Sequence, residues 1–265
     1  MIRHFIITIL LVYIVFVATL FFFQKKLQYM PSGNIKSPEF YNLQNFTEQK
    51  LITKDDIEII SWYKKPKEGQ KVVLYFHGNG GNLSGRIHRY QFLSKDFAVL
   101  AVSYRGYSGN KGEVSEEGFF IDSKTAYEFL KNEGFRDEDI ILYGESLGSS
   151  VALNLAQNKN FDAIILESPF YSALSVAKSR YPFVPIKYLL KDQFRSDLFV
   201  KNVDVPILIF HGTNDNIVNY SEGKKLFDEI SGKKQLVVVE EAGHLDFSNE
   251  FLMRNINMFL SEIQQ

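Results

Sequence analysis

Ser146 stands in the stretch YGESLG, where a short apolar run meets a segment with helical spacing. The run Ile140–Tyr143 is typical of a buried strand, and Leu147, Val151 and Leu155 recur at the spacing of one helix face. A serine at this junction either caps the helix or projects from a sharp turn as a nucleophile. Because a serine hydroxyl is a weak nucleophile, the second interpretation requires a general base and a third group that orients the base.

Histidine is the most common general base, and the chain contains 5 histidines. His77, His211 and His244 each follow an apolar run that is typical of a strand. His4 precedes a long apolar segment, and His88 lies in a predicted amphipathic helix. Ligand chemistry in an open parallel sheet gathers beyond the carboxyl ends of the strands, so the first three histidines are the candidates.

A carboxylate that orients the base is found in two places. Asp215 follows the apolar run Ile207–Phe210, and Glu167 follows an earlier run. Asp215 is preferred, with Glu167 as the alternative. The order Ser146, Asp215, His244 puts nucleophile, acid and base on successive strand-end loops, as a nucleophile elbow requires. These residues predict covalent catalysis through an acyl-enzyme.

The small residues around Ser146 agree with an elbow. A nucleophile in a strained turn needs small neighbours two residues away on either side, and Gly144 and Gly148 meet this need. The backbone N–H of Leu147, at the start of the helix, is one predicted oxyanion donor. The loop YFHGNGGN provides the second, and we assign it to the backbone N–H of Asn79.

Several other functions are disfavoured. The loop HGNGGNL lacks the glycine spacing of a dinucleotide site and the Lys of a phosphate-binding loop. No cluster of His or carboxylates has metal-ligand spacing, so neither a metal nor a cofactor is predicted. The chain contains 0 cysteines and has a net charge of -1. We therefore expect no disulfide, no thiolate chemistry and no nucleic-acid partner.

Apolar runs alternate with helical patterns through most of the chain. This alternation predicts an α/β fold, with one mostly parallel central sheet flanked by helices. The runs are continuous and not alternating, which is typical of strands covered on both faces. Predicted strands are Val72–Phe76, Ala98–Tyr104, Ile140–Tyr143, Ala163–Leu166, Ile207–Phe210 and Leu236–Val239, and predicted helices are Glu117–Asn132, Ser221–Ile230 and Ser248–Ile263.

The stretch between Glu167 and Val203 breaks this alternation, because it contains no strand pattern. Its aromatic and aliphatic residues are interrupted by Pro182 and Pro185. The stretch predicts either a small cap of short helices at about 168–202 or an ordinary connecting helix packed on the sheet.

The N-terminal segment Phe5–Phe23 carries no charge. At about 1.5 Å per residue, such a helix nearly spans a hydrocarbon core of about 30 Å. An uncleaved transmembrane anchor is preferred over a cleaved signal peptide, because no small-residue cleavage site follows. The lysines behind the segment favour a cytoplasmic domain, whereas long domains are often translocated regardless of charge. We expect an extracytoplasmic domain.

The motifs YFHGNGGN, SYRGYSGNKGEVSEEGF, LYGESLGSSVALNLA, IFHGTND and EAGHLDF together resemble the α/β-hydrolase superfamily. The likeness is strongest to membrane-anchored alpha/beta hydrolase domain-containing proteins, the Bem-type, serine aminopeptidase-like branch. The resemblance implies an α/β-hydrolase fold with a small cap after the sixth strand. It also implies Ser146, Asp215 and His244 as catalytic residues, and Asn79 and Leu147 as the oxyanion hole.

The resulting prediction is a membrane-anchored serine hydrolase of a carboxylic ester or thioester, with a small-molecule or lipid-derived substrate. An aminopeptidase-like serine peptidase, with Glu145 or Glu167 binding the substrate amino group, is one alternative. A non-catalytic anchored scaffold is the other. We predict three parts: an anchor at 1–26, a linker and first edge of the fold at 27–50, and the catalytic domain at 51–265.

Overall fold

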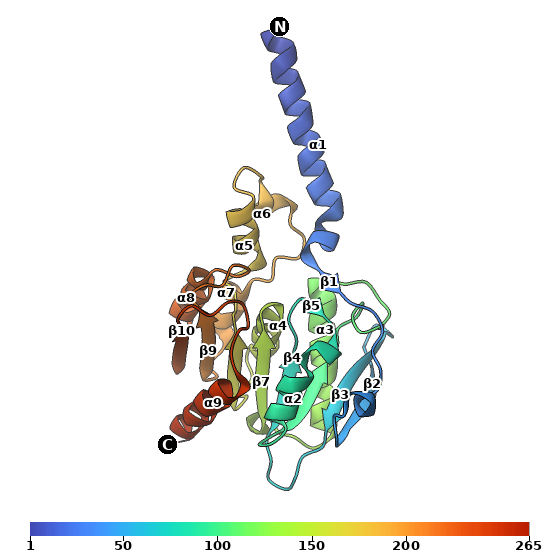
Figure 1. Cartoon of the computed structure of the whole chain (residues 1–265), viewed down its shortest axis with the longest axis vertical. Helices are drawn as coiled ribbons and strands as arrows, with labels where there is room; N and C mark the ends of the chain where they lie inside the picture. Colours follow the sequence, from blue (N-terminus) through green and yellow to red (C-terminus); the bar gives the residue numbers. More distant parts are fainter. Residues whose placement is uncertain (265) are drawn as a thin grey trace.

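The computed structural model describes residues 1–264, and its centre is a sheet with the strand order β10-β9-β8-β7-β4-β6-β3-β2 (Figure 1). A short parallel pair, β1 with β5, lies outside this sheet. The strands are β1 Met30–Pro31, β2 Phe46–Ile52, β3 Glu58–Lys64, β4 Val72–Phe76, β5 Gly80–Gly81, β6 Ala98–Val102, β7 Ile140–Glu145, β8 Ala163–Glu167, β9 Ile207–Gly212 and β10 Lys234–Val239.

The sheet is mostly parallel, as predicted. The six strands β10, β9, β8, β7, β4 and β6 pair in parallel, and these are the six predicted from apolar runs. β3 pairs antiparallel with both β2 and β6, which extends the sheet by a hairpin. The sequence prediction does not include β2 and β3 as strands.

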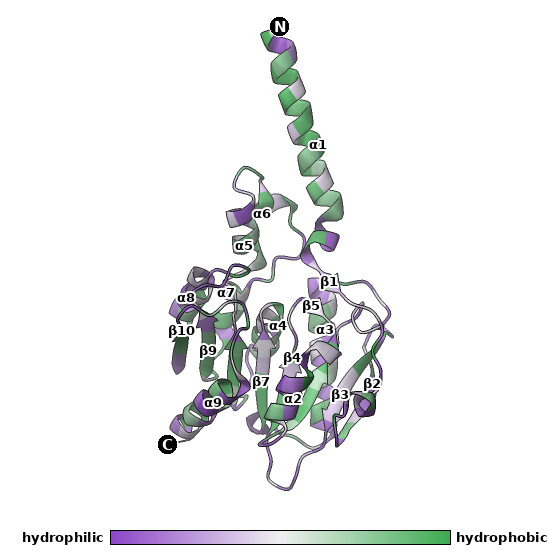
Figure 2. Ribbon diagram, in the orientation of Figure 1, coloured by the Kyte–Doolittle hydropathy of each residue, from purple (hydrophilic) through white to green (hydrophobic). Residues whose placement is uncertain are grey.

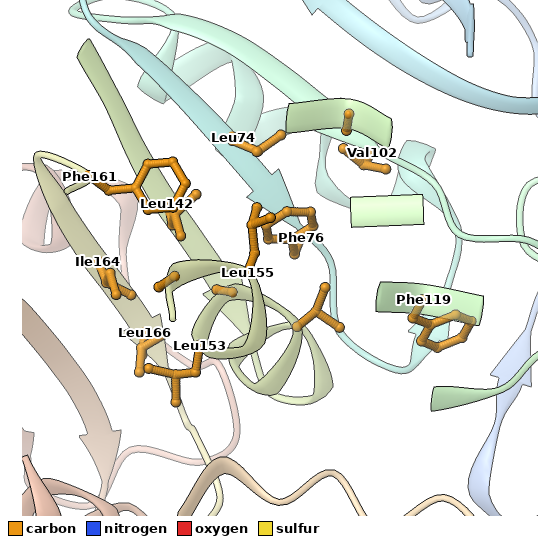
Figure 3. Packing of buried hydrophobic residues seen from close by; sticks show 14 of the residues in the cluster. Leu74, Phe76, Val102, Phe119, Leu142, Leu153, Leu155, Phe161, Ile164 and Leu166 are labelled. Atoms are coloured by element: carbon orange, nitrogen blue, oxygen red, sulfur yellow. The ribbon is translucent and has the colours of Figure 1, made fainter. Parts of the chain in front are cut away.

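Two layers of helices cover the sheet. α3 Glu116–Asn132, α4 Leu147–Ala156 and α8 Tyr220–Glu229 pack on one face, and α2 Ile87–Leu93 and α9 Asn249–Ile263 on the other. Alternate residues of one strand therefore belong to different halves of the core. In β4, Leu74 and Phe76 belong to the cluster on the first face, with Leu153 and Leu155 of α4 (Figure 3), while Val73 and Tyr75 face α2 and α9.

The prediction that the strands are covered on both faces is confirmed for five of them. Every residue of β4, β6, β7, β8 and β9 is buried. The prediction is wrong for β10, where most residues are half-buried. β10 is an edge strand that pairs with β9 alone, so its outer edge and part of its faces meet solvent.

The segment between β8 and β9 contains three short helices, α5 Ala173–Arg180, α6 Ile186–Leu189 and α7 Ser196–Phe199. β8 is the sixth strand of the central sheet in chain order, as predicted for the position of a cap. α5 and α6 stand beyond the end of the sheet, beside the N-terminal helix (Figure 1). α7 instead contacts α4, so only the first part of the segment forms a cap.

The N-terminal helix α1 spans Ile2–Gln28 and has no buried residue. Its 27 residues extend about 40 Å at 1.5 Å per residue. It projects from the body and is apolar along most of its length (Figure 2). By length and composition α1 is able to cross a membrane, although a signal sequence has the same features. The helix continues to Gln28, two residues beyond the predicted anchor, and the next residue, Tyr29, is buried in the body.

Candidate active site

Ser146 occupies the sharp turn between β7 and α4. Its backbone has φ 47° and ψ −111°, a conformation that a residue with a side chain rarely adopts. The turn is held on both sides, because the Ser146 N–H donates to the Glu167 carbonyl at 2.8 Å and the Ser149 N–H donates to the Ser146 carbonyl at 3.0 Å. This strain is typical of a functional residue whose surroundings fix its conformation.

The two glycines of the motif have steric reasons to be glycine. A Cβ on Gly144 would stand 2.6 Å from the carbonyl oxygen of Gly148, and a Cβ on Gly148 would overlap the carbonyl oxygen of Phe76. Both obstacles are backbone atoms, which cannot swing away as a flexible side chain would. The glycines thus let α4 approach the sheet closely behind the turn.

Gly148→Ala is expected to lower the free energy of unfolding by about 1–3 kcal/mol, because overpacking against Phe76 forces the backbone of α4 to shift. The matched control is Gly85→Ala, since a Cβ at Gly85 meets no atom within 4 Å. Urea unfolding of both variants measures the effect. Equal stability of the two variants would contradict the steric account.

Asp215 and His244 come from neighbouring loops and form a hydrogen bond. The Nδ1 atom of His244 lies 2.7 Å from Oδ2 of Asp215. The other carboxylate oxygen accepts the backbone N–H groups of Ile217 and Val218, at 2.9 and 2.8 Å. Asp215 is 3% exposed, so its orientation is fixed by these partners. With Nδ1 donating to the carboxylate, Nε2 of His244 is the nitrogen left to accept a proton.

The surroundings of Asp215 favour its ionised form. Burial by itself raises the pKa of this carboxyl, but the contacts with His211 and His244 and the Val218 N–H outweigh burial. The result is a pKa well below the usual range. Asp215 is therefore a carboxylate wherever a neutral histidine base is able to act.

A lowered pKa in the folded state means that the unfolded chain binds more protons on acidification. The stability that ionised Asp215 provides is then fully present above its ordinary pKa of 3.8 and is lost as the pH falls towards the lower folded value. We expect the difference in unfolding free energy between wild type and Asp215→Asn to be constant from pH 8 to about 5 and to shrink below about 4. Urea titrations at these pH values test it, and a difference that has already vanished at pH 6 would refute it.

The two other strand-end histidines have structural partners. His77 is fully buried, its Nδ1 lies 2.7 Å from the Gly78 carbonyl, and burial lowers its pKa to about 4. His211 is also fully buried, and its Nε2 lies 2.9 Å from the Val218 carbonyl and 3.5 Å from Asp215. Of the three strand-end candidates, His244 alone is both paired with a carboxylate at hydrogen-bond distance and partly exposed.

The carboxylates of Glu145 and Glu167 point into the protein and are neutralised there. Glu145 accepts from Arg86 Nε at 2.9 Å, from the Gly78 N–H at 3.3 Å and from the Tyr75 hydroxyl. Burial opposes ionisation of Glu145, yet the Arg86 charge and these hydrogen bonds lower its pKa. Neither glutamate lines the cavity at Ser146. Both glutamates are instead paired with arginine and tyrosine side chains inside the protein.

Glu167 has an equivalent set of partners. It accepts from Arg89 Nη2 at 3.1 Å and from the Tyr143 hydroxyl. It does not contact His244, so the alternative acid of the sequence analysis is separated from the candidate base. Arg86 and Arg89 are the residues that sequence reasoning missed, and their spacing of three on one helical segment is the signal that could have revealed a matched pair.

A cavity of about 260 Å³ adjoins Ser146. Leu147 and Asn79, the two predicted oxyanion donors, line it with Ser146. Val218, whose N–H binds Asp215, lines it too. Within residues 1–264 no hydrogen bond joins Ser146 to His244. The structure pairs the acid with the base, and Val218 connects this pair to the cavity that Ser146 lines. Most other lining residues are apolar, none is acidic, and Arg180 is the single charged one among them.

Comparison with solved structures identifies the fold. A Pyrococcus furiosus esterase superposes with a TM-score of 0.71 over 90% of this chain and 98% of its own, at 16% identity. An alpha-beta hydrolase from Vibrio vulnificus gives 0.67 over 83% and 82%, at 22% identity. Together with the sheet order and the elbow, these likenesses establish an α/β-hydrolase fold, as the motifs predict.

Sequence comparison then gives the family. Residues 84–256 match the prolyl oligopeptidase family, and the chain belongs to it. An uncharacterised protein of Mycobacterium tuberculosis is 32% identical over 246 residues, covering 90% of this chain and 88% of its own. Lysophosphatidylserine lipase ABHD12 of Danio rerio is 33% identical over 197 residues, 66% of this chain and 51% of that protein. The comparisons support a hydrolase.

Proposed function

We propose that this protein is a membrane-anchored serine hydrolase that cleaves the carboxylic ester, or thioester, of an acyl lipid. The observation on which the proposal depends most is the Asp215–His244 pair, 2.7 Å apart, together with the strained turn at Ser146. A fixed carboxylate–histidine pair next to an elbow serine is the arrangement that activates a hydroxyl.

The proposed reaction has two stages. The Oγ of Ser146 attacks the acyl carbon, and its proton passes to Nε2 of His244. The carbonyl oxygen becomes an oxyanion that the N–H groups of Leu147 and Asn79 stabilise. As the first residue of α4, Leu147 has no acceptor for its N–H within the helix. His244 then protonates the leaving alcohol, and a water molecule hydrolyses the acyl-enzyme by the same steps.

An ester is preferred over a peptide because of the cavity. Its lining is apolar apart from a few amides, the hydroxyls of Ser146 and Tyr181, and one positive charge, Arg180. A pocket that selects an N-terminal amino group needs a nearby carboxylate, and the lining contains none. A mostly apolar pocket instead favours a hydrocarbon chain. A relative named as a lysophosphatidylserine lipase is in keeping with this choice.

Substrate profiling of the purified full chain tests the proposal. We expect hydrolysis of monoacyl glycerols or lysophospholipids, with Ser146→Ala as the control for contaminating lipases. Cleavage of acetyl esters without acyl lipids would overturn the lipid assignment. Cleavage of aminoacyl arylamides in place of esters would favour the peptidase, and a folded protein inert towards all of these would favour the scaffold.

The loop that holds Asn79 is expected to depend on Arg86. Arg86 Nη1 donates to the Gly80 carbonyl at 2.6 Å, and Arg86 also binds Glu145, which accepts the Gly78 N–H. Arg86→Met should release this loop and lower kcat by about 10²–10³-fold, the effect of losing one oxyanion donor.

Arg89→Met is the matched control for that substitution. It likewise leaves a buried glutamate without its arginine, a loss of about 3–5 kcal/mol of stability. It does not contact the loop, because Arg89 binds Glu167 and Asn249. Steady-state kinetics at a temperature where both variants are folded separates the two effects. Equal losses of kcat would mean that Arg86 acts only through stability.

Membrane attachment through an uncleaved α1, with the domain outside the cytoplasm, belongs to the same proposal. Alkaline extraction of membranes and the intact mass of the purified chain test attachment and retention of α1. Protease added to intact spheroplasts is expected to digest the domain. Complete protection before lysis would reverse the orientation.

A further inference from the structure

The last two turns of α1 are bonded to the cap by polar side chains. Gln24 donates from Nε2 to the Leu189 carbonyl at 3.3 Å and accepts the Lys191 N–H at 2.8 Å. One turn further, Gln28 donates to the Asp192 carbonyl at 2.8 Å. The two glutamines lie on either side of Lys25 and Lys26 at the end of α1, and both contact the segment 189–192. The contacts fix the end of α1 against the catalytic domain.

Apolar residues complete the junction. Val17 and Leu20 of α1 pack on a small cluster of the cap that includes Leu174, Val184 and Ile186. The α1 residue Gln28 also reaches the predicted oxyanion loop, because its carbonyl accepts the Asn79 Nδ2 amide at 2.6 Å. α1 therefore contacts both the cap and the loop beside Ser146.

The cavity at Ser146 continues along α1. Its lining includes Leu20, Gln24 and Leu27 from the helix. A second cavity of about 40 Å³ shares Leu20 and Gln24 with the first and adds Phe21. The cap residues Ile186 and Leu190 line both cavities, so the two adjoin between α1 and α6. The apolar space thus leads from Ser146 along α1 as far as Leu20.

We propose that this space is an acyl-chain channel, with α1 as one wall, through which a lipid chain passes from the bilayer to Ser146. The proposal rests on the proposed function and adds the route and the specificity-determining face of α1. A volume of about 260 Å³ lies just under the roughly 300–1,000 Å³ of pockets for drug-sized ligands, which suits a single acyl chain.

The outer end of the channel lies where α1 enters the membrane. Beyond Leu20, α1 is apolar and largely exposed as far as Ile2, so this part is the membrane-embedded portion. The cap tip contacts α1 within this embedded portion, because the Tyr13 hydroxyl donates to the Phe183 carbonyl at 2.7 Å. Phe183 and Tyr188 of the tip are 87% and 82% exposed. Exposed aromatic residues beside a membrane helix are typical of the interface with lipid.

Because the chain contains no cysteine, a single introduced cysteine is its only thiol, and labelling of that thiol tests the channel directly. Leu20→Cys introduces one thiol into the channel wall, and Lys26→Cys introduces one at an exposed position of the same helix, outside the lining of both cavities. Full-length protein in nanodiscs is treated with a fluorophosphonate bearing either a methyl or a hexadecyl group. In each case the Ser146 Oγ–P bond forms, fluoride leaves and the hydroxyl proton passes to His244. N-ethylmaleimide modification of the thiol is then followed by mass spectrometry.

The tethered long chain is present at an effective concentration in roughly the mM range, so modification at position 20 should be lost. The methyl adduct should leave it unchanged, and position 26 should react equally with either adduct. Adducts that form without protection at position 20 would overturn the channel and leave the proposed function standing. No adduct on folded protein would overturn both. Leu27→Cys, in the same lining, serves if Leu20→Cys does not fold.

Discussion

Ser146→Ala is expected to lower kcat for the best ester by about 10⁴-fold or more, because removal of the nucleophile leaves only binding and oxyanion stabilisation. The fold should persist, because alanine and serine both carry a Cβ and the backbone strain at φ 47° is therefore the same for each. The measurement is ester turnover at saturating substrate, with thermal unfolding as the check on folding.

Ser150→Ala is the matched control for this variant. Ser150 lies four residues further in α4, is fully buried, and its hydroxyl has no hydrogen-bond partner within residues 1–264. Ser150→Ala removes a serine hydroxyl from α4, the helix that follows the turn, and leaves the turn itself unchanged. Activity that survives in Ser146→Ala at the level of Ser150→Ala would mean that another group is the nucleophile.

Asp215→Asn is the second substitution with a large expected effect, a loss of about 10⁴-fold in kcat. An amide at this position presents an N–H group towards His244, which disfavours the imidazole tautomer with Nε2 ready to accept a proton. The carboxylate also stabilises the imidazolium that forms during the reaction. Kinetics of the variant from pH 6 to 9 would measure the loss.

Glu167→Gln separates the two acids of the sequence analysis. Burial raises the pKa of Glu167 to about 7 against the opposing charge of Arg89, so glutamine resembles a form that is already populated at neutral pH. We expect this variant to keep nearly full kcat. If Glu167→Gln were the inactive variant and Asp215→Asn the active one, the assignment of the acid would be reversed.

The central strands were predictable because they are buried on both faces and therefore read as continuous apolar runs. β4 matches the predicted Val72–Phe76 at both ends. β2 was not predictable in this way, because it is an edge strand with mostly exposed or half-buried residues. β3 is stabilised by antiparallel pairing with β2 and β6, and local patterning does not report such pairing. β10 was correctly predicted as a strand, but its burial was overestimated, because its apolar run lies at an edge of the sheet.

The candidate site also has a part that the sequence predicts and a part that it does not. The serine turn has a local signature, because backbone strain demands glycine at fixed positions, and histidine and aspartate are recognisable from their places after strands. The walls of the cavity have no such signature. Gln24 and the Leu189 carbonyl meet across 165 positions of the chain, and Arg86 reaches Glu145 across 59. Contacts of this kind arise from the tertiary fold, so the part played by α1 and Arg86 emerges only from the structure.

The proposed hydrolase activity requires an activated serine at position 146, and covalent labelling tests that requirement most directly. The purified full chain, Ser146→Ala and His244→Ala are each treated with a fluorophosphonate, and the adduct is located by intact mass and peptide mapping. The account predicts one adduct on Ser146 in the wild type, none on Ser146→Ala, and a greatly slowed reaction in His244→Ala. A folded wild-type protein that stays unmodified, or an adduct on another residue, would contradict it.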